Sequence, residues 1–199
     1  MSDKSKNKKQ ERIAVFASGA GSNAGEIMKH FEHHKRIKVV LIVTNKSDAG
    51  VIQVAKDFNV DVAIISKTIL NDEEKMRGIL EKYKISFIVL AGFLLLIPAY
   101  LIKLFPKCIV NIHPALLPNF GGKGMYGRFV HEAVKNASVT ETGITIHFCN
   151  AHYDEGDIIF QATCRVDTND TPDNIAQKVH ALEHQYYPKM IEKTIDERL

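Results

Sequence analysis

The sequence predicts an α/β fold with a mainly parallel, twisted sheet flanked by helices and an antiparallel hairpin near the C-terminus. Three observations lead to this fold class. Short β-branched runs alternate with helical stretches through the first half of the chain, which is the rhythm of right-handed βαβ units. A Gly-rich turn joins the first strand to the first helix. Two β-rich runs follow each other late in the chain, and this spacing is typical of a hairpin.

Length and composition indicate one domain. The 199 residues are 45% hydrophobic, enough for one sizeable core and short for two, so we expect a single domain over residues 13–199. Four lysines crowd the head, and residues 1–12 are expected to be a disordered basic tail. The whole chain has 26 basic and 23 acidic residues, and because the four lysines lie in the head, the rest is close to neutral, which argues against a nucleic-acid partner. The head lacks the apolar segment of a secretory signal or membrane span.

The cysteines suggest a reducing compartment. Cys108, Cys149 and Cys164 are odd in number and form no Cys-x-x-Cys pair. This pattern fits free thiols better than a disulfide framework or a zinc site, and it predicts a cytoplasmic protein.

An anion site is expected at the first turn. The apolar run 13–17 predicts a strand, and Ser-Gly-Ala-Gly-Ser-Asn at 18–23 leads into a helix from Ala24 to about His33. This arrangement points backbone N–H groups at an anion, and Ser22 and Asn23 are natural capping residues. We interpret it as a phosphate site.

A dinucleotide site is the alternative for the same turn. Gly19, Gly21 and Ala24 satisfy the loose G-x-G-x-x-A pattern. The next strand, 38–43, should then end in an acid that holds a ribose hydroxyl, but it ends in Thr-Asn-Lys at 44–46. A phosphate site without NAD is therefore favoured.

Three histidines share one face near the end of the first helix. His30, His33 and His34 have a spacing that metal ligands can use. No acidic or thiol partner is placed to complete a site, and imidazoles near a helix C-terminus interact favourably with its dipole. We expect no metal here.

The middle of the chain continues the alternation. The pattern predicts helices over 51–58 and 73–83 and strands over 62–65 and 85–90. The apolar run 91–98 is too short to span a bilayer and contains Gly and Pro. Most of it is expected in the core, with the alternative that its aliphatic side chains wall a site for a flat aromatic ligand.

The central candidate site lies on the strand that begins at Ile109. Side chains alternate along a strand, so Asn111 and His113 project from one face. Pro114 ends regular pairing and leaves His113 at the strand tip, where open α/β sheets bind ligands. A carboxamide beside an imidazole is suited to stabilising an oxyanion during acyl transfer. The alternative is that both groups only satisfy local hydrogen bonds.

The last part of the chain predicts a loop, a hairpin and a long helix. The Gly-rich segment 119–127 is either a lid or a plain connection, and 128–136 is helical. Strands over 142–148 and 158–166 enclose a polar tip, which on its own is only a polar loop. If it folds back over Asn111 and His113, one of its acids would orient His113 and favour its protonated form. A helix is expected from Thr171 to about Tyr186, with a break at Pro188.

With these pieces in place, the chain resembles the phosphoribosylglycinamide formyltransferases, a family of folate-dependent formyltransferases of purine synthesis. The resemblance spans nearly everything after the tail and implies a Rossmann-like formyltransferase fold. Single segments are weak, but their order and spacing together are specific. They are Ser18–Asn23, Ala91–Phe93, Asn111–Pro118, His147-Phe148, Tyr153–Gly156, Glu183-His184 and Tyr187-Pro188.

The resemblance also implies roles for individual residues. Asn111, His113 and Asp154 match the catalytic set. Gly21, Ser22, Asn23 and Glu183 would bind phosphoribosylglycinamide. The folate would lie against Leu94, Leu95, Leu96, Ile97, Asn111, Ala151, His152, Tyr153 and Asp154. Leu95 stands where some members carry Arg, and the 119–127 loop is richer in Gly than expected, so the contacts of the folate's glutamate tail and of this loop are left open.

The implied reaction is transfer of a formyl group from 10-formyltetrahydrofolate, as co-substrate, to the substrate amine, with no metal. Asn111 and His113 would stabilise the oxyanion, and Asp154 would keep His113 protonated and aid proton transfer. Methionyl-tRNA formyltransferase and formyltetrahydrofolate deformylase share this core, but their relatives carry an additional domain for which we expect no room here. A catalytically silent nucleotide-sensing module is the remaining alternative. We expect a monomer or homodimer.

Overall fold

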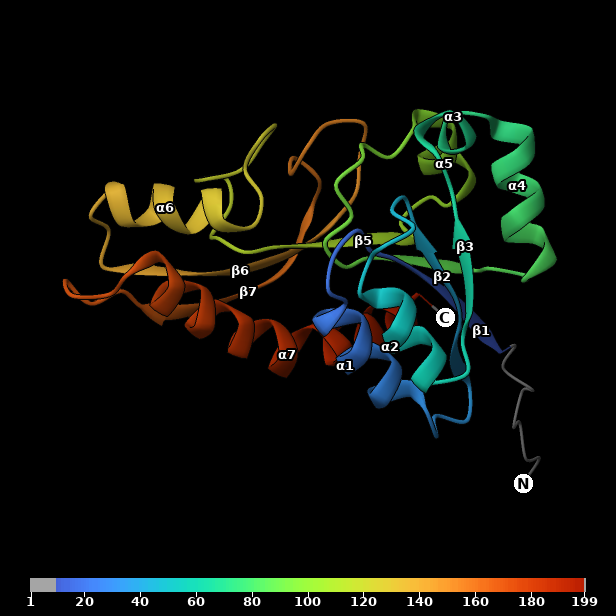
Figure 1. The fold of residues 1–199 in the computed structure, drawn as a ribbon, viewed down its shortest axis with the longest axis horizontal. Coiled ribbons are helices and arrows are strands. Elements are labelled where there is room, and N and C mark those ends of the chain that lie inside the picture. The colour runs from blue at the N-terminus through green and yellow to red at the C-terminus, as the bar shows by residue number, and fades with distance from the viewer. Residues whose placement is uncertain (1–9, 199) are drawn as a thin grey trace, which may run out of the picture.

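A seven-stranded sheet in the order β3-β2-β1-β4-β5-β6-β7 is the centre of the computed structural model, which describes residues 10–198 (Figure 1). Strands β1 to β5 are parallel, whereas β6 pairs antiparallel with β5 and β7 antiparallel with β6. The predicted fold class and C-terminal hairpin are confirmed. The strands are β1 Glu11–Phe16, β2 Ile37–Thr44, β3 Asp61–Ile64, β4 Phe87–Leu90, β5 Ile109–His113, β6 Glu141–Phe148 and β7 Ile158–Arg165.

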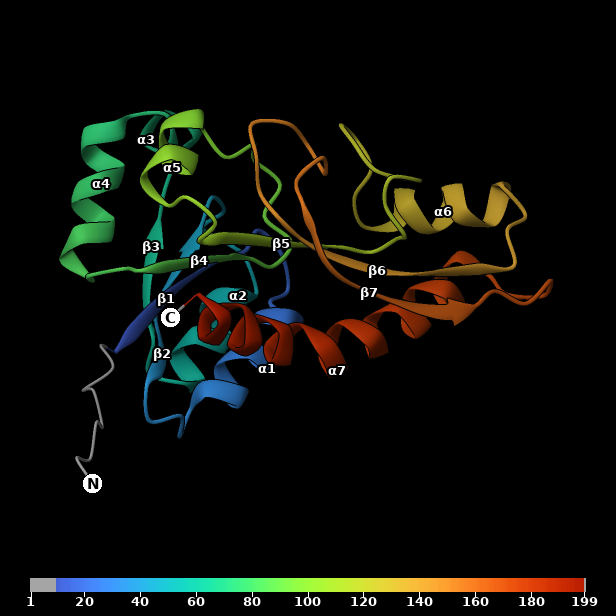
Figure 2. The ribbon, with the colours of Figure 1, turned by 180° about the vertical axis from the view of Figure 1, so that it is seen from behind.

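Helices cover both faces of the sheet. On one face lie α1, α2 and α7, with α6 packed against α7; α3, α4 and α5 lie on the other (Figure 1). From behind, α7 is seen to run beneath β5, β6 and β7 (Figure 2). The helices are α1 Ser22–Phe31, α2 Val51–Asp57, α3 Lys67–Leu70, α4 Glu73–Lys82, α5 Ala99–Leu104, α6 Arg128–Asn136 and α7 Pro172–Glu197. None of the helices between residues 10 and 198 is long and apolar enough to cross a membrane.

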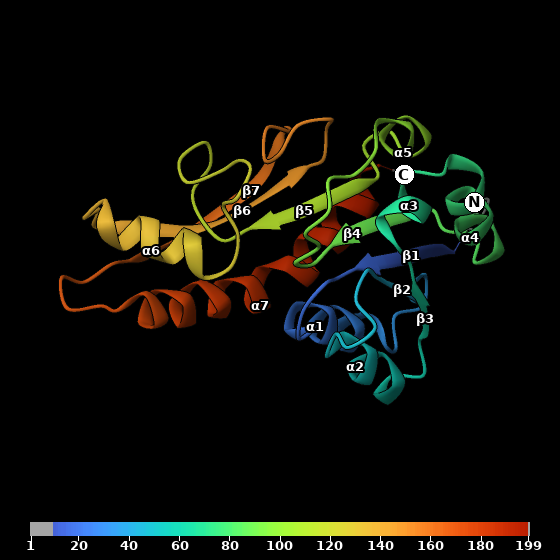
Figure 3. The same cartoon turned by 45° about the horizontal axis from the view of Figure 1, so that its top comes forward.

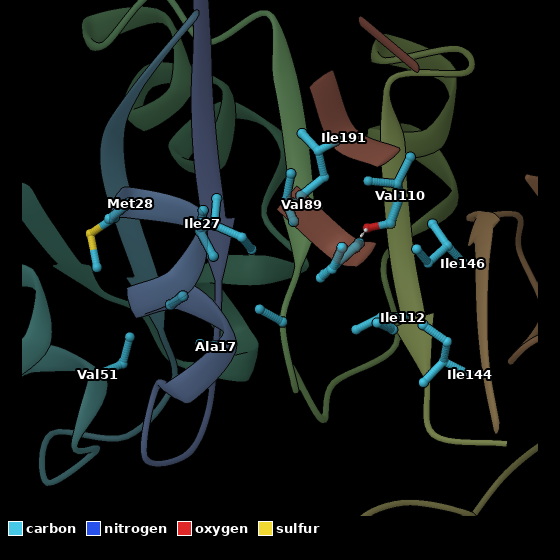
Figure 4. Packing of buried hydrophobic residues seen from close by; sticks show 14 of the residues in the cluster. Ala17, Ile27, Met28, Val51, Val89, Val110, Ile112, Ile144, Ile146 and Ile191 are labelled. Atoms are coloured by element: carbon cyan, nitrogen blue, oxygen red, sulfur yellow. Dashed lines mark hydrogen bonds between the residues drawn. The ribbon is translucent and has the colours of Figure 1, made fainter. Parts of the chain in front are cut away.

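Two hydrophobic clusters, one on each face, hold the layers together. In β1, Ile13 and Val15 belong to the cluster with α1, α2 and α7, while Ala14 and Phe16 belong to the cluster with α3, α4 and α5. This is the period-two alternation of a strand buried on both sides. Figure 4 shows Ile191 of α7 close to sheet residues of the first cluster. The sheet is therefore a rigid platform for the loops at its edge.

The N-terminal boundary of the domain lies earlier than expected. Strand β1 begins at Glu11, whose side chain is 4% exposed and accepts hydrogen bonds from Ser86 Oγ at 2.6 Å and Arg198 Nη2 at 3.0 Å. Residues 11 and 12 thus belong to the sheet and not to the tail. The rest of the predicted disordered tail, up to residue 9, lies outside the described residues. Helices α3 and α5 were not predicted from the sequence.

The predicted break at Pro188 is wrong. Helix α7 runs without interruption through Pro188, which is buried. The neighbouring Tyr187 is fully buried and donates its hydroxyl to the carbonyl oxygens of Leu90 at 2.8 Å and Val110 at 3.3 Å. Packing against the ends of β4 and β5 therefore outweighs the hydrogen bond that a proline removes from a helix.

The histidines near the end of α1 do have an acidic partner, contrary to expectation. Glu192 of α7 lies 2.6 Å from His30 Nε2 and 3.4 Å from His34 Nε2. His33, by contrast, is solvent-exposed. The pairing was missed because the carboxylate comes from a helix distant in sequence, and its effect is to tie α1 to α7.

Candidate active site

The main cavity opens at the carboxyl edge of the parallel strands. Its volume is about 470 Å³, and the segments that follow β1, β2, β4 and β5 line it. The arrowheads of β1, β4 and β5 point the same way in Figure 3. The sheet order places β1 beside β4, so chain connections leave in opposite directions at this point, which is where open α/β sheets bind ligands.

The predicted anion turn lines this cavity. Gly21 adopts φ +86°, a left-handed conformation that favours glycine, and a Cβ there would lie 2.7 Å from Val51 Cα. Helix α1 starts at Ser22 and has no side-chain cap. The expectation that Ser22 and Asn23 cap the helix is therefore wrong, because both lie inside its first turn. Their backbone N–H groups are left available to an anion.

Asn23 and Glu183 form a pair across the same cavity. Asn23 Nδ2 donates to Glu183 Oε2 at 2.8 Å, and Asn23 Oδ1 is buried without a hydrogen-bond partner. Glu183 is 5% exposed, and burial raises the pKa of its carboxyl group. The structure thus brings together Gly21, Ser22, Asn23 and Glu183 in one cavity. Glu183 is kept from solvent because α7 packs against α1.

Asn111, His113 and Asp154 converge at the tip of β5. The Asp154 carboxylate lies 3.5 Å from Asn111 Nδ2 through Oδ1 and 3.5 Å from His113 Nδ1 through Oδ2. The backbone N–H of Gly122 also donates to Asp154 Oδ2 at 2.9 Å. One carboxylate from the β6–β7 loop therefore contacts both polar side chains of the β5 tip, which lie on the same side of the sheet.

His147 completes the cluster, and no role for it was predicted from the sequence. It faces Asn111 in the β5–β6 register, and its Nε2 lies 3.1 Å from Asn111 Nδ2 and 3.7 Å from Asp154 Oδ1. Its Nδ1 donates to the Phe148 carbonyl oxygen at 2.9 Å, and its Nε2 lies within reach of both Asn111 and Asp154. Predicting the antiparallel pairing of β6 with β5 would have identified His147, because this pairing places it opposite Asn111.

The expectation that Asp154 keeps His113 protonated stays a prediction, because burial and the Asp154 carboxylate act on the pKa of this ring in opposite directions. Burial lowers the pKa of His113 and outweighs the opposing effect of the Asp154 carboxylate. The ring is 3% exposed, and its Nε2 donates to the Phe120 carbonyl oxygen at 2.8 Å. Burial also raises the pKa of Asp154, but His147, His113 and Gly122 lower it by more, so this group stays ionised. The Asp154 carboxylate therefore favours the protonated form of His113, but burial has the larger effect on the pKa of this ring.

The tip loop that carries Asp154 is fixed by close backbone contacts. Asp154 has φ +58°, a conformation that Asp tolerates better than most residues. Two residues on, a Cβ on Gly156 would lie 1.7 Å from the Phe148 carbonyl oxygen. Phe148 N also donates to the Asp157 carbonyl oxygen at 2.9 Å. These contacts set where the Asp154 carboxylate lies.

The expected folate residues divide into two groups. A second, small cavity of about 50 Å³ is lined by Leu95, Leu96, Ile97, Asn111, His152, Tyr153 and Asp154. Asn111, Tyr153 and Asp154 also line the main cavity, Leu94 lines only the main cavity, and Ala151 lines neither. Ile97 is buried in the core, whereas Leu94 and Leu96 are 40% and 42% exposed. The run 91–98 is thus part core and part exposed wall.

Other residues of the main cavity were not singled out from the sequence. Lys46, His131 and His180 line it together with the predicted groups. Ser18 joins three segments by donating to Asn45 Oδ1 at 2.5 Å and accepting from Leu94 N at 3.1 Å. Among residues 10–198, no group of three His, Cys, Asp or Glu side chains is arranged to hold a metal ion.

Fold and site together define an α/β enzyme that binds its ligands at the carboxyl edge of a parallel sheet, with an Asn, His and Asp cluster next to an anion-binding turn. A sequence profile of the formyl transferase family matches residues 11–191. The chain belongs to this family.

The relatives are similar to this chain over most of its length. The chain is 41% identical to the chloroplastic phosphoribosylglycinamide formyltransferase of Arabidopsis thaliana, over 96% of this chain and 68% of that protein. It is 35% identical to phosphoribosylglycinamide formyltransferase of Bacillus subtilis, over 93% and 95% of the two chains. The crystal structure of phosphoribosylglycinamide formyltransferase from Bacillus halodurans superposes with a TM-score of 0.84 at 32% identity, covering 95% of this chain and 97% of that one.

Proposed function

We propose that the protein transfers the formyl group of 10-formyltetrahydrofolate to the amine of 5′-phosphoribosylglycinamide, yielding formylglycinamide ribotide and tetrahydrofolate in purine biosynthesis. The observation that carries the proposal is the Asp154 carboxylate, 3.5 Å from both Asn111 Nδ2 and His113 Nδ1, beside a cavity that also contains the anion turn. The names of the similar proteins support the choice of substrates.

Asn111 is suited to stabilise the oxyanion. When the amine attacks the formyl carbon, negative charge develops on the formyl oxygen, and a preorganised donor there is worth about 3 to 4 kcal/mol. The Asn111 Nδ2 group is fixed at 3.1 Å from His147 Nε2. Its second N–H makes only a long contact of 3.5 Å with Asp154 Oδ1, and we propose that this N–H turns to the formyl oxygen when the folate binds.

His113 requires a local rearrangement before it can donate to the same oxygen. Its Nε2–H is taken by the Phe120 carbonyl oxygen at 2.8 Å. Phe120 has φ +56° and is followed by Gly121 and Gly122, so the backbone at this point has the freedom to move its carbonyl away. Negative charge on the formyl oxygen would then favour protonated His113, adding to the effect of Asp154 against burial. The proton lost by the amine has to reach the departing folate nitrogen, and Asp154 and His113 lie where they can relay it.

The anion turn fits the phosphate of the ribotide. Gly21, Ser22 and Asn23 line the cavity at the N-terminus of α1, where backbone N–H groups and the helix dipole favour negative charge. The Lys46 ammonium group on the same cavity adds positive charge. Asn23 Oδ1 and Glu183 are acceptors for the hydroxyl and N–H groups of the ribose and glycinamide.

The folate subsite would open on binding. Its cavity of about 50 Å³ is far below the 300 to 1,000 Å³ typical of ligand sites. The pteridine would separate segment 94–97 from the β6–β7 loop at 151–154 and contact Leu94 and Leu96, the exposed aliphatic residues of the run. Both substrates are small molecules, and the proposal requires no metal and no nucleic acid.

We also propose a cytoplasmic location and a monomer or homodimer. Cys108, Cys149 and Cys164 are free thiols, as expected in a reducing compartment. The similar plant proteins are named as chloroplastic, so cell fractionation is the test of location. Sedimentation velocity tests the oligomeric state.

The reaction is tested by incubating the protein with both substrates and following release of tetrahydrofolate and formation of formylglycinamide ribotide. Stoichiometric appearance of both products is expected. Tetrahydrofolate release without the ribotide would indicate a deformylase instead. Binding of a nucleotide or NAD with no turnover would indicate a sensing module and overturn the proposal.

A further inference from the structure

A buried histidine of α6 lines the main cavity and is not used by the proposed reaction. His131 is 3% exposed, and its Nδ1 is buried without a hydrogen-bond partner. It nevertheless lines the same cavity as His113 and Glu183. Neither ring nitrogen of His131 forms a hydrogen bond among residues 10–198, so Nε2, the nitrogen that is not enclosed, is left for a partner that enters the cavity.

The surroundings of His131 keep its ring neutral. The His180 ring lies edge-on at 6.5 Å between centroids, and within residues 10–198 no carboxylate forms an ion pair with His131. Burial lowers the pKa of His131 to about 4; the nearby His180 and His113 act in the same direction, and the Asp173 carboxylate opposes them with the smallest effect. At neutral pH the ring therefore carries one proton, on one of its two nitrogens.

The proton is best placed on Nε2. Nδ1 is enclosed by protein, which leaves Nε2 as the ring nitrogen that faces the cavity. An unpaired buried acceptor is tolerated better than an unpaired buried N–H donor. The stable tautomer thus has a bare Nδ1 and presents an Nε2–H group to the ligand.

We propose that His131 binds the glycinamide portion of the ribotide by donating a hydrogen bond from Nε2–H to its amide carbonyl oxygen. This inference rests on the proposed function and adds a residue that the sequence did not point to. Across the cavity, Asn23 Oδ1 and Glu183 supply acceptors, and Asn23 Nδ2 already donates to Glu183 Oε2, so Nε2–H of His131 would add a donor for this carbonyl. A neutral donor has a further advantage, because it cannot transfer a proton to the nearby substrate amine, which must stay unprotonated to attack.

Three variants separate this role from a structural one. Gln places an N–H donor near the position of Nε2, Asn is too short to do so, and Leu fills the space without a donor. Loss of one neutral hydrogen bond should raise KM for the ribotide about 3- to 10-fold in His131→Leu and His131→Asn, with kcat and the KM for the folate little changed. His131→Gln should stay within about two-fold of the wild type.

A matched control is available in His184, whose Nε2 is also buried without a partner but which does not line the cavity. His184→Leu should leave KM for the ribotide unchanged, and thermal unfolding of all variants reports any structural loss. An unchanged KM for the ribotide in His131→Leu, equal changes for both substrates, or identical behaviour of the Gln and Leu variants would overturn the role of His131. A wild-type protein that neither turns over nor binds the ribotide in calorimetry would overturn the proposed function instead.

Discussion

The Asp154 carboxylate lies 3.5 Å from Nδ1 of His113, although His113 ends strand β5 and Asp154 belongs to the β6–β7 loop. The same carboxylate accepts from Gly122 N at 2.9 Å, so the tip loop, the Gly-rich loop and the strand meet at one group. In Figure 3 the two loops lie side by side above β5 and β6. We expect that removing the charge of Asp154 while keeping its size affects catalysis more than folding.

Asp154→Asn should lower kcat by roughly 100- to 10,000-fold, the range for loss of a group that assists proton transfer. The amide keeps the size of the side chain but removes the charge that opposes the burial of His113. His113→Ala should lower kcat similarly. Release of tetrahydrofolate measures both, and circular dichroism tests whether the fold is kept. Near wild-type turnover in either variant would remove that residue from the mechanism.

Gly21→Ala should weaken ribotide binding. The new Cβ would lie 2.7 Å from Val51 Cα, and φ +86° is unfavourable for alanine. The turn must then shift away from α2 and disturb the anion site, so KM for the ribotide should rise at least about ten-fold, as for loss of one charge-assisted hydrogen bond.

Gly78→Ala is the control for Gly21→Ala. Gly78 lies inside α4 with no atom within 4 Å of a new Cβ. This substitution should leave KM unchanged and raise the free energy of unfolding by about 0.5 to 1 kcal/mol. Equal ribotide KM values in the two variants would argue against an anion site at this turn.

Gly156→Ala should displace the loop that carries Asp154. Its Cβ would meet the Phe148 carbonyl oxygen at 1.7 Å, a backbone atom that belongs to the sheet. We expect a loss of about 1 to 3 kcal/mol in unfolding free energy from the overlap, together with a lower kcat because the carboxylate moves. Chemical denaturation and steady-state kinetics measure the two effects. A variant with normal kcat would show that the position of this loop does not control the reaction.

Stability should depend on pH through His131. Its pKa is about 4 in the folded state, below the ordinary value of 6.5, so between these values the unfolded chain binds more protons. The free energy of unfolding should therefore fall as pH decreases from about 6.5 to about 4, by at most roughly 3 kcal/mol from this residue. His113, whose pKa is also lowered by burial, acts in the same direction.

Urea denaturation of the wild type and of His131→Gln across this pH range provides the measurement. The variant has no group that titrates at this position, so its stability should change less with pH. Parallel curves for the two proteins would show that His131 is protonated as readily in the folded state as in the unfolded chain.

Several features followed from local sequence. The alternation of β-branched runs and helices predicted the sheet, because period two and the helical repeat are properties of a few neighbouring residues. The glycine turn before α1 and the shared face of Asn111 and His113 were predicted for the same reason. At Pro188 local reasoning failed, because the contacts of Tyr187 with the ends of β4 and β5 hold the helix together.

The sequence by itself determined the fold class, the anion turn and the two polar groups at the tip of β5. Only the tertiary structure decided which groups surround them: His147 from the neighbouring strand, the Phe120 carbonyl on His113, and His131 from α6. The tertiary structure also determines the pKa of His113, because this pKa depends on the balance between burial and a nearby carboxylate. The surrounding groups and the pKa both depend on segments that are distant along the chain. A local sequence pattern does not show how close these segments come in the folded protein.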